Sequence, residues 1–120
     1  MDLKECYRRL GGDFDEVMGR LRREQMIAKF VIKFLDDKSF ALFESSMAEK
    51  NYDEALRAVH TLKGICQNLS FTQLFESSYA VTKALKEKNV EQALALAPQL
   101  SRDYQRVIGA VEEYRRSVEG

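Results

Sequence analysis

The chain contains a single histidine, His60, and three residues that follow it at helical spacing could assist chemistry at its ring. Imidazole is a nucleophile at neutral pH because its unperturbed pKa is about 6.5. If His60 accepts a phosphoryl group, Lys63 can place an ammonium beside the negative charge that the ring gains. Gly64 removes a side chain where a second protein would have to bring its own active site close. Gln67 could hydrogen-bond the phosphoryl oxygens or make no particular contact.

These residues also have interpretations without chemistry. A surface histidine near a lysine is common and usually has no function, and a glycine within a helix sometimes only permits close helix packing. Glycine costs about 1 kcal/mol of helix stability relative to alanine, so Gly64 needs a reason to stand there. Spacing and residue type alone leave both interpretations open.

The segment 52–69, which carries these residues, is predicted to be one helix because its apolar residues recur with the helical period. On that helix His60 lies at the edge of the apolar stripe and faces water, and Lys63 and Gly64 flank it on the next turn. The apolar stripe is expected to consist of Ala55, Val59, Leu62, Cys66 and Leu69.

Helical spacing also predicts the elements on either side. We expect a short helix over 13–21, further helices over about 27–35 and 40–50, one after residue 70, and a long last helix with a heptad-like seam. Ser70-x-x-Gln73 is a possible capping box, and Pro98 predicts a kink or a helix break just before it. The expected buried residues are Ile27, Phe30, Val31, Phe34 and Leu35, then Phe40, Phe43 and Met47, then Leu74, Phe75, Ser78, Val81 and Leu85, and finally Ala97, Leu100, Tyr104, Val107, Val111, Tyr114 and Val118.

Two similar segments, 49–56 and 87–94, stand 38 residues apart. They could mark a helical-hairpin repeat of the tetratricopeptide type, whose period is about 34 residues. We favour shared turn chemistry instead, in which Asn51 or Asn89 ends one helix in a left-handed conformation and an acidic stretch starts the next. Short turns between antiparallel helices predict an all-α fold. The fold that we expect is an antiparallel up-down four-helix bundle with one or two additional N-terminal helices.

The composition excludes several classes of protein. The 120 residues include 19 basic and 19 acidic side chains, which argues against binding to nucleic acid or to anionic lipid. The sequence has no apolar run long enough to span a membrane and no signal peptide, so a cytoplasmic protein is expected. Cys6 and Cys66 are expected to be reduced thiols, and a single histidine with two scattered cysteines predicts no metal site.

The run Ala58-Val59-His60-Thr61-Leu62-Lys63-Gly64 resembles the Ala-x-His-x-Leu-Lys-Gly motif of histidine-containing phosphotransfer (HPt) domains. Leu69-Ser70-Phe71 and Leu74 resemble the Leu-Gly-Ala-x-x-Leu continuation of that motif. The likeness covers about residues 13–118, so the chain is expected to be one HPt domain over 1–120 with its bundle core at about 38–118. Ser70 departs from the usual glycine, and Ile65 and Cys66 replace usual small residues.

The resemblance implies a phosphocarrier of a two-component multistep phosphorelay rather than an enzyme. His60 would take a phosphoryl group from the aspartate of one receiver domain and pass it to another receiver, with Lys63, Gly64 and Gln67 in support. The partners would be response-regulator receiver domains, and possible further partners include a hybrid sensor histidine kinase. The chain would bind no cofactor of its own, and the receiver would supply Mg²⁺.

Docking would use an apolar patch near His60, with Arg57 and Thr61 as candidate contacts. A monomer is expected because one molecule already builds the whole site. The alternative function is a helical interaction module, either tetratricopeptide-like or an HPt-like scaffold that is not phosphorylated. A metal-oxidising helical bundle would need several inward-facing Glu and His ligands, which one histidine does not supply.

Overall fold

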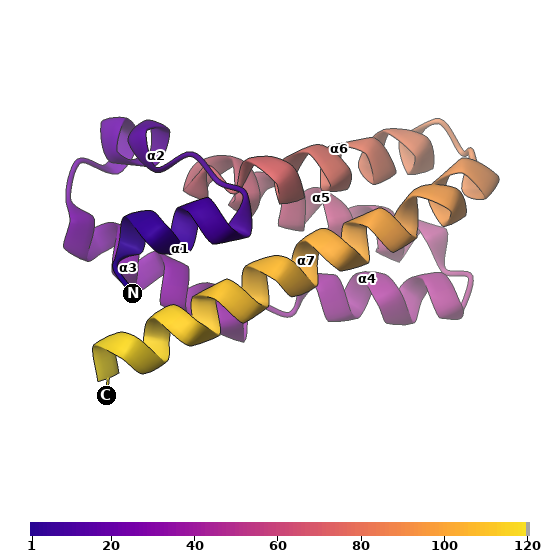
Figure 1. The fold of residues 1–120 in the computed structure, drawn as a ribbon. Helices are drawn as coiled ribbons and strands as arrows, with labels where there is room; N and C mark the ends of the chain where they lie inside the picture. The colour runs from indigo at the N-terminus through magenta and orange to yellow at the C-terminus, as the bar shows by residue number, and fades with distance from the viewer. Residues whose placement is uncertain (120) are drawn as a thin grey trace.

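The computed structural model describes residues 1–119, and these residues form helices joined by short turns. The last four helices in the chain pack as a bundle, and the helices that precede them gather at one end of it (Figure 1). The elements are α1 (Leu3–Leu10), α2 (Phe14–Leu21), α3 (Glu24–Lys33), the 3₁₀ turn η1 (Phe34–Asp36), α4 (Ser39–Ala48), α5 (Tyr52–Leu69), α6 (Thr72–Lys86) and α7 (Val90–Glu119).

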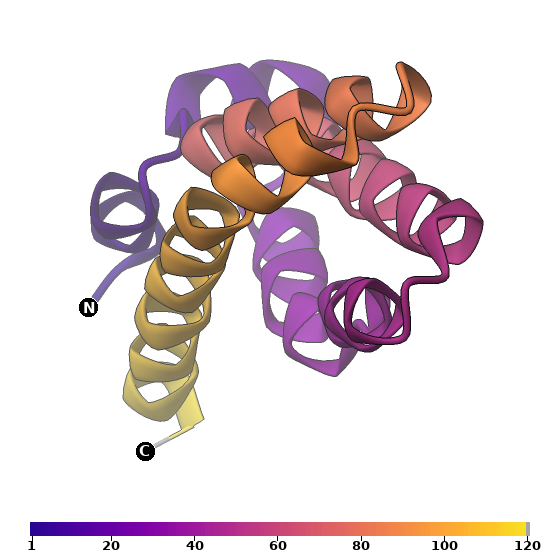
Figure 2. The ribbon, with the colours of Figure 1, turned by 90° about the vertical axis from the view of Figure 1, so that its right-hand side faces the viewer.

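Helices α4 to α7 form the bundle, in which α4 packs against α5, α5 against α6 and α6 against α7. The predicted all-α bundle with additional N-terminal helices is confirmed (Figures 1 and 2). The ring of Phe40 on α4 stacks on that of Tyr104 on α7, so the first and last helices of the bundle meet. A row of stacked tetratricopeptide hairpins would leave these two helices apart, so the tetratricopeptide interpretation is wrong. Helix α7, at about 45 Å, is longer than α5 at about 27 Å. Part of the length of α7 is covered by α1 and α3.

The two similar segments are turns, as predicted, but the asparagines have a different role in them. Lys50 and Lys88 adopt the left-handed conformation, with φ of 59° and 57°. Asn51 and Asn89 instead cap the next helix, where each side-chain oxygen accepts a hydrogen bond from the amide three residues later. The cap at Asn51 fixes where α5 begins.

Two expectations about the helices need correction. Helix α1 was not predicted separately, because its charged residues obscure a buried face of Leu3, Cys6, Tyr7 and Leu10. The capping box is wrong, since Phe71 is the N-cap of α6 and Ser70 lies in the left-handed conformation that ends α5.

The expected core residues are mostly inside, with two clear exceptions. Phe30 is 40% exposed and Val118 is 54% exposed. Helix α7 continues through Pro98 without a break, and its first turns run at an angle to the rest (Figure 2). The bend follows from the missing N–H of proline, which leaves one carbonyl of the preceding turn without its helical partner.

The C-terminal end of α5 is held by the N-terminal helices. The Arg20 guanidinium donates to the carbonyls of Gln67 and Asn68, and the buried Tyr7 hydroxyl donates to the Leu69 carbonyl at 2.7 Å. Carbonyls in the last turn of a helix lack partners within it, so these bonds satisfy them, and the bond from Tyr7 satisfies the buried carbonyl of Leu69. Helices α1 and α2 therefore fix one end of the helix that carries His60.

We expect Tyr7→Phe to destabilise the fold by about 1–3 kcal/mol, because the buried Leu69 carbonyl then loses the hydrogen bond that the Tyr7 hydroxyl donates. Urea unfolding measures this change. Tyr79→Phe is the matched control, because the exposed Tyr79 hydroxyl makes no hydrogen bond within residues 1–119, and its loss should change stability by less than about 0.5 kcal/mol. Equal unfolding midpoints for the Tyr7→Phe protein and the parent would contradict the anchoring role of Tyr7.

Candidate functional site

Helix α5 lies between α4 and α6 and turns its apolar stripe inwards. His60 stands near its middle and is exposed, as predicted from the helical period. The buried neighbours Val59 and Leu62 anchor the same turn of helix in the core. The imidazole therefore projects into solvent from a rigid element, and no hydrogen bond within residues 1–119 occupies its ring nitrogens.

Lys63 follows His60 by almost one turn and lies on the side of α5 that faces α6. Its ammonium is 5.8 Å from the centre of the Tyr79 ring on α6. Lys63 is half-buried, whereas every other lysine of the chain is exposed. No carboxylate within residues 1–119 forms an ion pair with it. Its ammonium therefore has no carboxylate partner among residues 1–119, and it lies on the α6 side of the helix that carries His60.

Gly64 has no packing role in the fold. Apart from its chain neighbours and the backbone of its own helix, a Cβ built at this position would meet no heavy atom of residues 1–119 within 4 Å. Close helix packing therefore does not explain the glycine, although that interpretation was open from the sequence alone. The remaining explanation lies at the surface, where the missing side chain leaves room near His60 for another molecule.

The other predicted residues lie on the same exposed part of α5. Gln67 is exposed, and its side-chain amide makes no hydrogen bond within residues 1–119. Arg57 is exposed and pairs with Glu54 at 3.2 Å. The Thr61 hydroxyl donates to the Arg57 carbonyl at 3.0 Å, so it is not a free donor. Gln67 and the guanidinium of Arg57 are thus available to an incoming protein.

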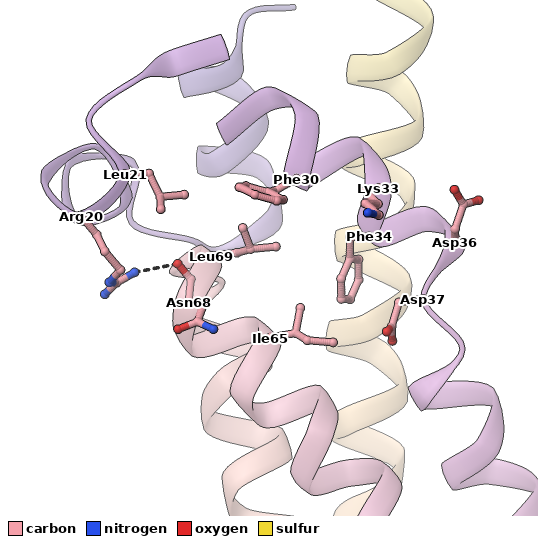
Figure 3. Close-up of a pocket in the computed structure, with 10 residues that line it drawn as sticks. All are labelled: Arg20, Leu21, Phe30, Lys33, Phe34, Asp36, Asp37, Ile65, Asn68 and Leu69. Atoms are coloured by element: carbon pink, nitrogen blue, oxygen red, sulfur yellow. Dashed lines mark hydrogen bonds between the residues drawn. The ribbon is translucent and has the colours of Figure 1, made fainter. Parts of the chain in front are cut away.

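A cleft of about 610 Å³ opens beside the C-terminal half of α5. Figure 3 shows Phe30, Phe34 and Ile65 turned towards the same space, while Arg20 bonds the Asn68 carbonyl at the rim. Ile65 lies about 140° around α5 from His60, so the cleft opens on a flank of the helix and is separated from His60 by the side that carries Arg57 and Thr61. Its lining residues are Arg20, Leu21, Phe30, Lys33, Phe34, Asp36, Asp37, Ile65, Asn68 and Leu69.

The two cysteines are buried free thiols that lie away from this surface. Burial raises the pKa of the Cys6 thiol to about 12 and raises the pKa of the Cys66 thiol as well. Both are therefore held in the unreactive protonated form. Within the described part of the chain no three His, Cys, Asp or Glu side chains gather as metal ligands, and no helix is long and apolar enough to cross a membrane.

Sequence reasoning missed two features of this surface, Tyr79 and the cleft with Phe30. Tyr79 lies off the apolar face predicted for its helix, and an exposed aromatic residue in that position is a signal that could have been noted. Phe30 fits the helical period of a buried face, so its exposure depends on how α3 sits against α5 and could not be predicted from spacing.

The fold and the site together define a class: an antiparallel helical bundle that presents one histidine from the exposed face of a central helix. The family model of the Hpt domain matches residues 16–110, and the chain belongs to this family. No curated protein and no solved structure matches the chain. Hpt domains are phosphocarrier modules of two-component phosphorelays that work through phosphohistidine and interact with receiver domains and kinases.

Proposed function

We propose that this chain accepts a phosphoryl group on His60 from the aspartyl phosphate of one receiver domain and passes it to the aspartate of another. The observation that carries the proposal is the exposed His60 between a half-buried Lys63 and a Gly64 that packs against nothing. Family membership supports the general activity, and the geometry supports His60 as the residue that performs it.

The transfer needs little covalent chemistry from this chain. The unprotonated ring nitrogen of His60 attacks the phosphorus, an N–P bond forms, and the O–P bond to the donor aspartate breaks, which regenerates its carboxylate. Transfer to the second receiver reverses these bonds, with an aspartate oxygen as the attacking group. Phosphoryl transfer depends mainly on in-line positioning and on charge stabilisation. The receiver would supply Mg²⁺ and most of that stabilisation, and His60 would supply an accessible nucleophile.

Lys63 would stabilise the phosphorylated state. Its ammonium lies on the α6 side of His60, and no carboxylate competes for it within residues 1–119. Charge-assisted hydrogen bonds to phosphoryl oxygens are stronger than neutral ones, so this cation would lower the free energy of phosphohistidine. Gln67 would add a neutral donor from the next turn of the helix.

The receiver would dock on a surface that runs from His60 across Gly64 into the cleft beside Ile65. A protein interface needs an apolar centre with a polar rim, and the cleft offers Phe30 and Phe34 as that centre. Arg57 and Thr61 lie on the side of α5 between His60 and Ile65, which supports their place in the rim. We further propose that the chain acts as a monomer in the cytoplasm.

The proposal is tested by incubating the chain with ³²P-phosphorylated receiver domains and Mg²⁺. We expect label to move to the chain, to be acid-labile and alkali-stable as an N–P bond is, and to leave when an unphosphorylated receiver is added. A chain that stays unlabelled with every receiver of a broad panel would contradict the proposal. That outcome would favour the alternative, a scaffold that binds partners without carrying a phosphoryl group.

A further inference from the structure

Tyr79 is an exposed aromatic residue whose ring is ordered by two neighbours. Its side chain is 51% exposed. The ring centre lies 6.1 Å from that of Phe75, one turn earlier on α6, with an angle of 38° between the planes. The Lys63 ammonium approaches the same ring at 5.8 Å from its centre. Tyr79 therefore joins the surface of α6 to the helix that carries His60.

Lys63 is less exposed than the other lysines of the chain, and its ammonium lies near the Tyr79 ring. A lysine on a helix surface normally extends its ammonium freely into water, as the exposed lysines of this chain do. Lys63 is the half-buried exception, and no ion pair within residues 1–119 holds it. The contact that the described structure shows for this ammonium is with the Tyr79 ring, 5.8 Å from its centre.

An aromatic ring suits this task better than a carboxylate. The face of the ring attracts a cation through its quadrupole but carries no net charge. A carboxylate at the same place would pair with Lys63 and would also repel a phosphoryl group on His60. The ring keeps the ammonium localised and leaves its full charge available to an anion.

We propose that Tyr79 is a positioning residue that holds the Lys63 ammonium beside His60, ready to contact the phosphoryl group. Phe75 supports the Tyr79 ring from below on the same helix. The inference rests on the proposed function of His60, but the contact between Tyr79 and Lys63 is a property of the free chain. It can therefore be measured without any transfer reaction.

The first test compares Tyr79→Phe, which keeps the ring, with Tyr79→Leu, which removes it. In NMR spectra of the unphosphorylated chain, the ring current of Tyr79 should shift the Lys63 ε-methylene protons upfield. We expect Tyr79→Phe to keep this shift and Tyr79→Leu to move the protons to the position of the exposed lysines. Lys63→Ala assigns the signal. A Lys63 signal that is the same in Tyr79→Leu and in the parent would overturn the inference.

The second test measures the phosphohistidine hydrolysis rate in the same variants. We expect Tyr79→Leu to shorten the lifetime about two- to fivefold, the range expected for an exposed cation–π contact, and Tyr79→Phe to restore it. In a Lys63→Ala background the same Tyr79→Leu change should have no further effect. An equal effect in both backgrounds would overturn the inference. If the parent chain takes no label, the proposed function fails, while the NMR shift still decides whether Tyr79 holds Lys63.

Discussion

The His60→Gln protein should take up no label from a phosphorylated receiver, a loss of at least about a hundredfold in the initial rate. The amide nitrogen of glutamine has no available lone pair, so no N–P bond can form, and the chain has no second histidine. Because His60 is exposed and makes no hydrogen bond within residues 1–119, the substitution should change the free energy of unfolding by less than about 0.5 kcal/mol. Labelling time courses and urea unfolding measure the two effects.

Gln67→Ala is the matched control for this experiment. Gln67 is also exposed and lies on the same face of α5, two turns from His60. We expect this variant to be labelled within a few fold of the parent, because it removes at most one neutral hydrogen bond. If the His60→Gln protein is labelled as fast as the parent, the phosphoryl group is carried elsewhere and the assignment of His60 is wrong.

Gly64→Leu should make the fold more stable and the transfer slower, an unusual combination. Leucine favours a helix over glycine by about 0.5–1 kcal/mol, and the space where its Cβ would stand is empty. The added side chain would fill the surface next to His60 and keep a receiver from approaching within bonding distance. We expect the transfer rate to fall at least about tenfold, with an intermediate effect for Gly64→Ala. Thermal unfolding and single-turnover labelling measure the two effects.

Gly109 provides the control within the same chain. It is an exposed helical glycine on α7, and a Cβ there would also meet no other part of the described residues 1–119 within 4 Å. Gly109→Leu should give a similar gain in stability and leave the transfer rate unchanged, since α7 is not the helix that carries His60. A Gly64→Leu protein that accepts phosphoryl groups as fast as the parent would show that the glycine does not provide room for the partner.

The extent of the helix that carries the site could be predicted from the sequence, because the apolar stripe runs with the helical period to Leu69. The side chain of Asn51 caps the start of this helix, although it was expected to end the preceding one. These are local signals, so they do not depend on the rest of the fold. The exposure of His60 follows from the same helical period, because His60 lies on a side of the helix that the buried stripe does not occupy.

Other features depend on contacts between segments that are distant in sequence. Ser70 resembles an N-cap in its local pattern, but its hydroxyl donates to Glu16 and accepts from Arg20, both on α2. The contact between Lys63 and Tyr79 requires the register of α5 against α6. The empty space at Gly64 is likewise a property of the packed bundle, and only the packed bundle excludes a helix-packing role for this glycine.

The central claim is that the phosphoryl group is bound to His60, and NMR of the phosphorylated chain tests it directly. The chain has one histidine, so its imidazole spectrum contains a single ring. We predict that phosphorylation by a receiver moves these imidazole signals and produces a ³¹P signal coupled to a ring nitrogen. A phosphorylated chain with unchanged imidazole signals, or with its ³¹P signal on a carboxylate, would contradict the account.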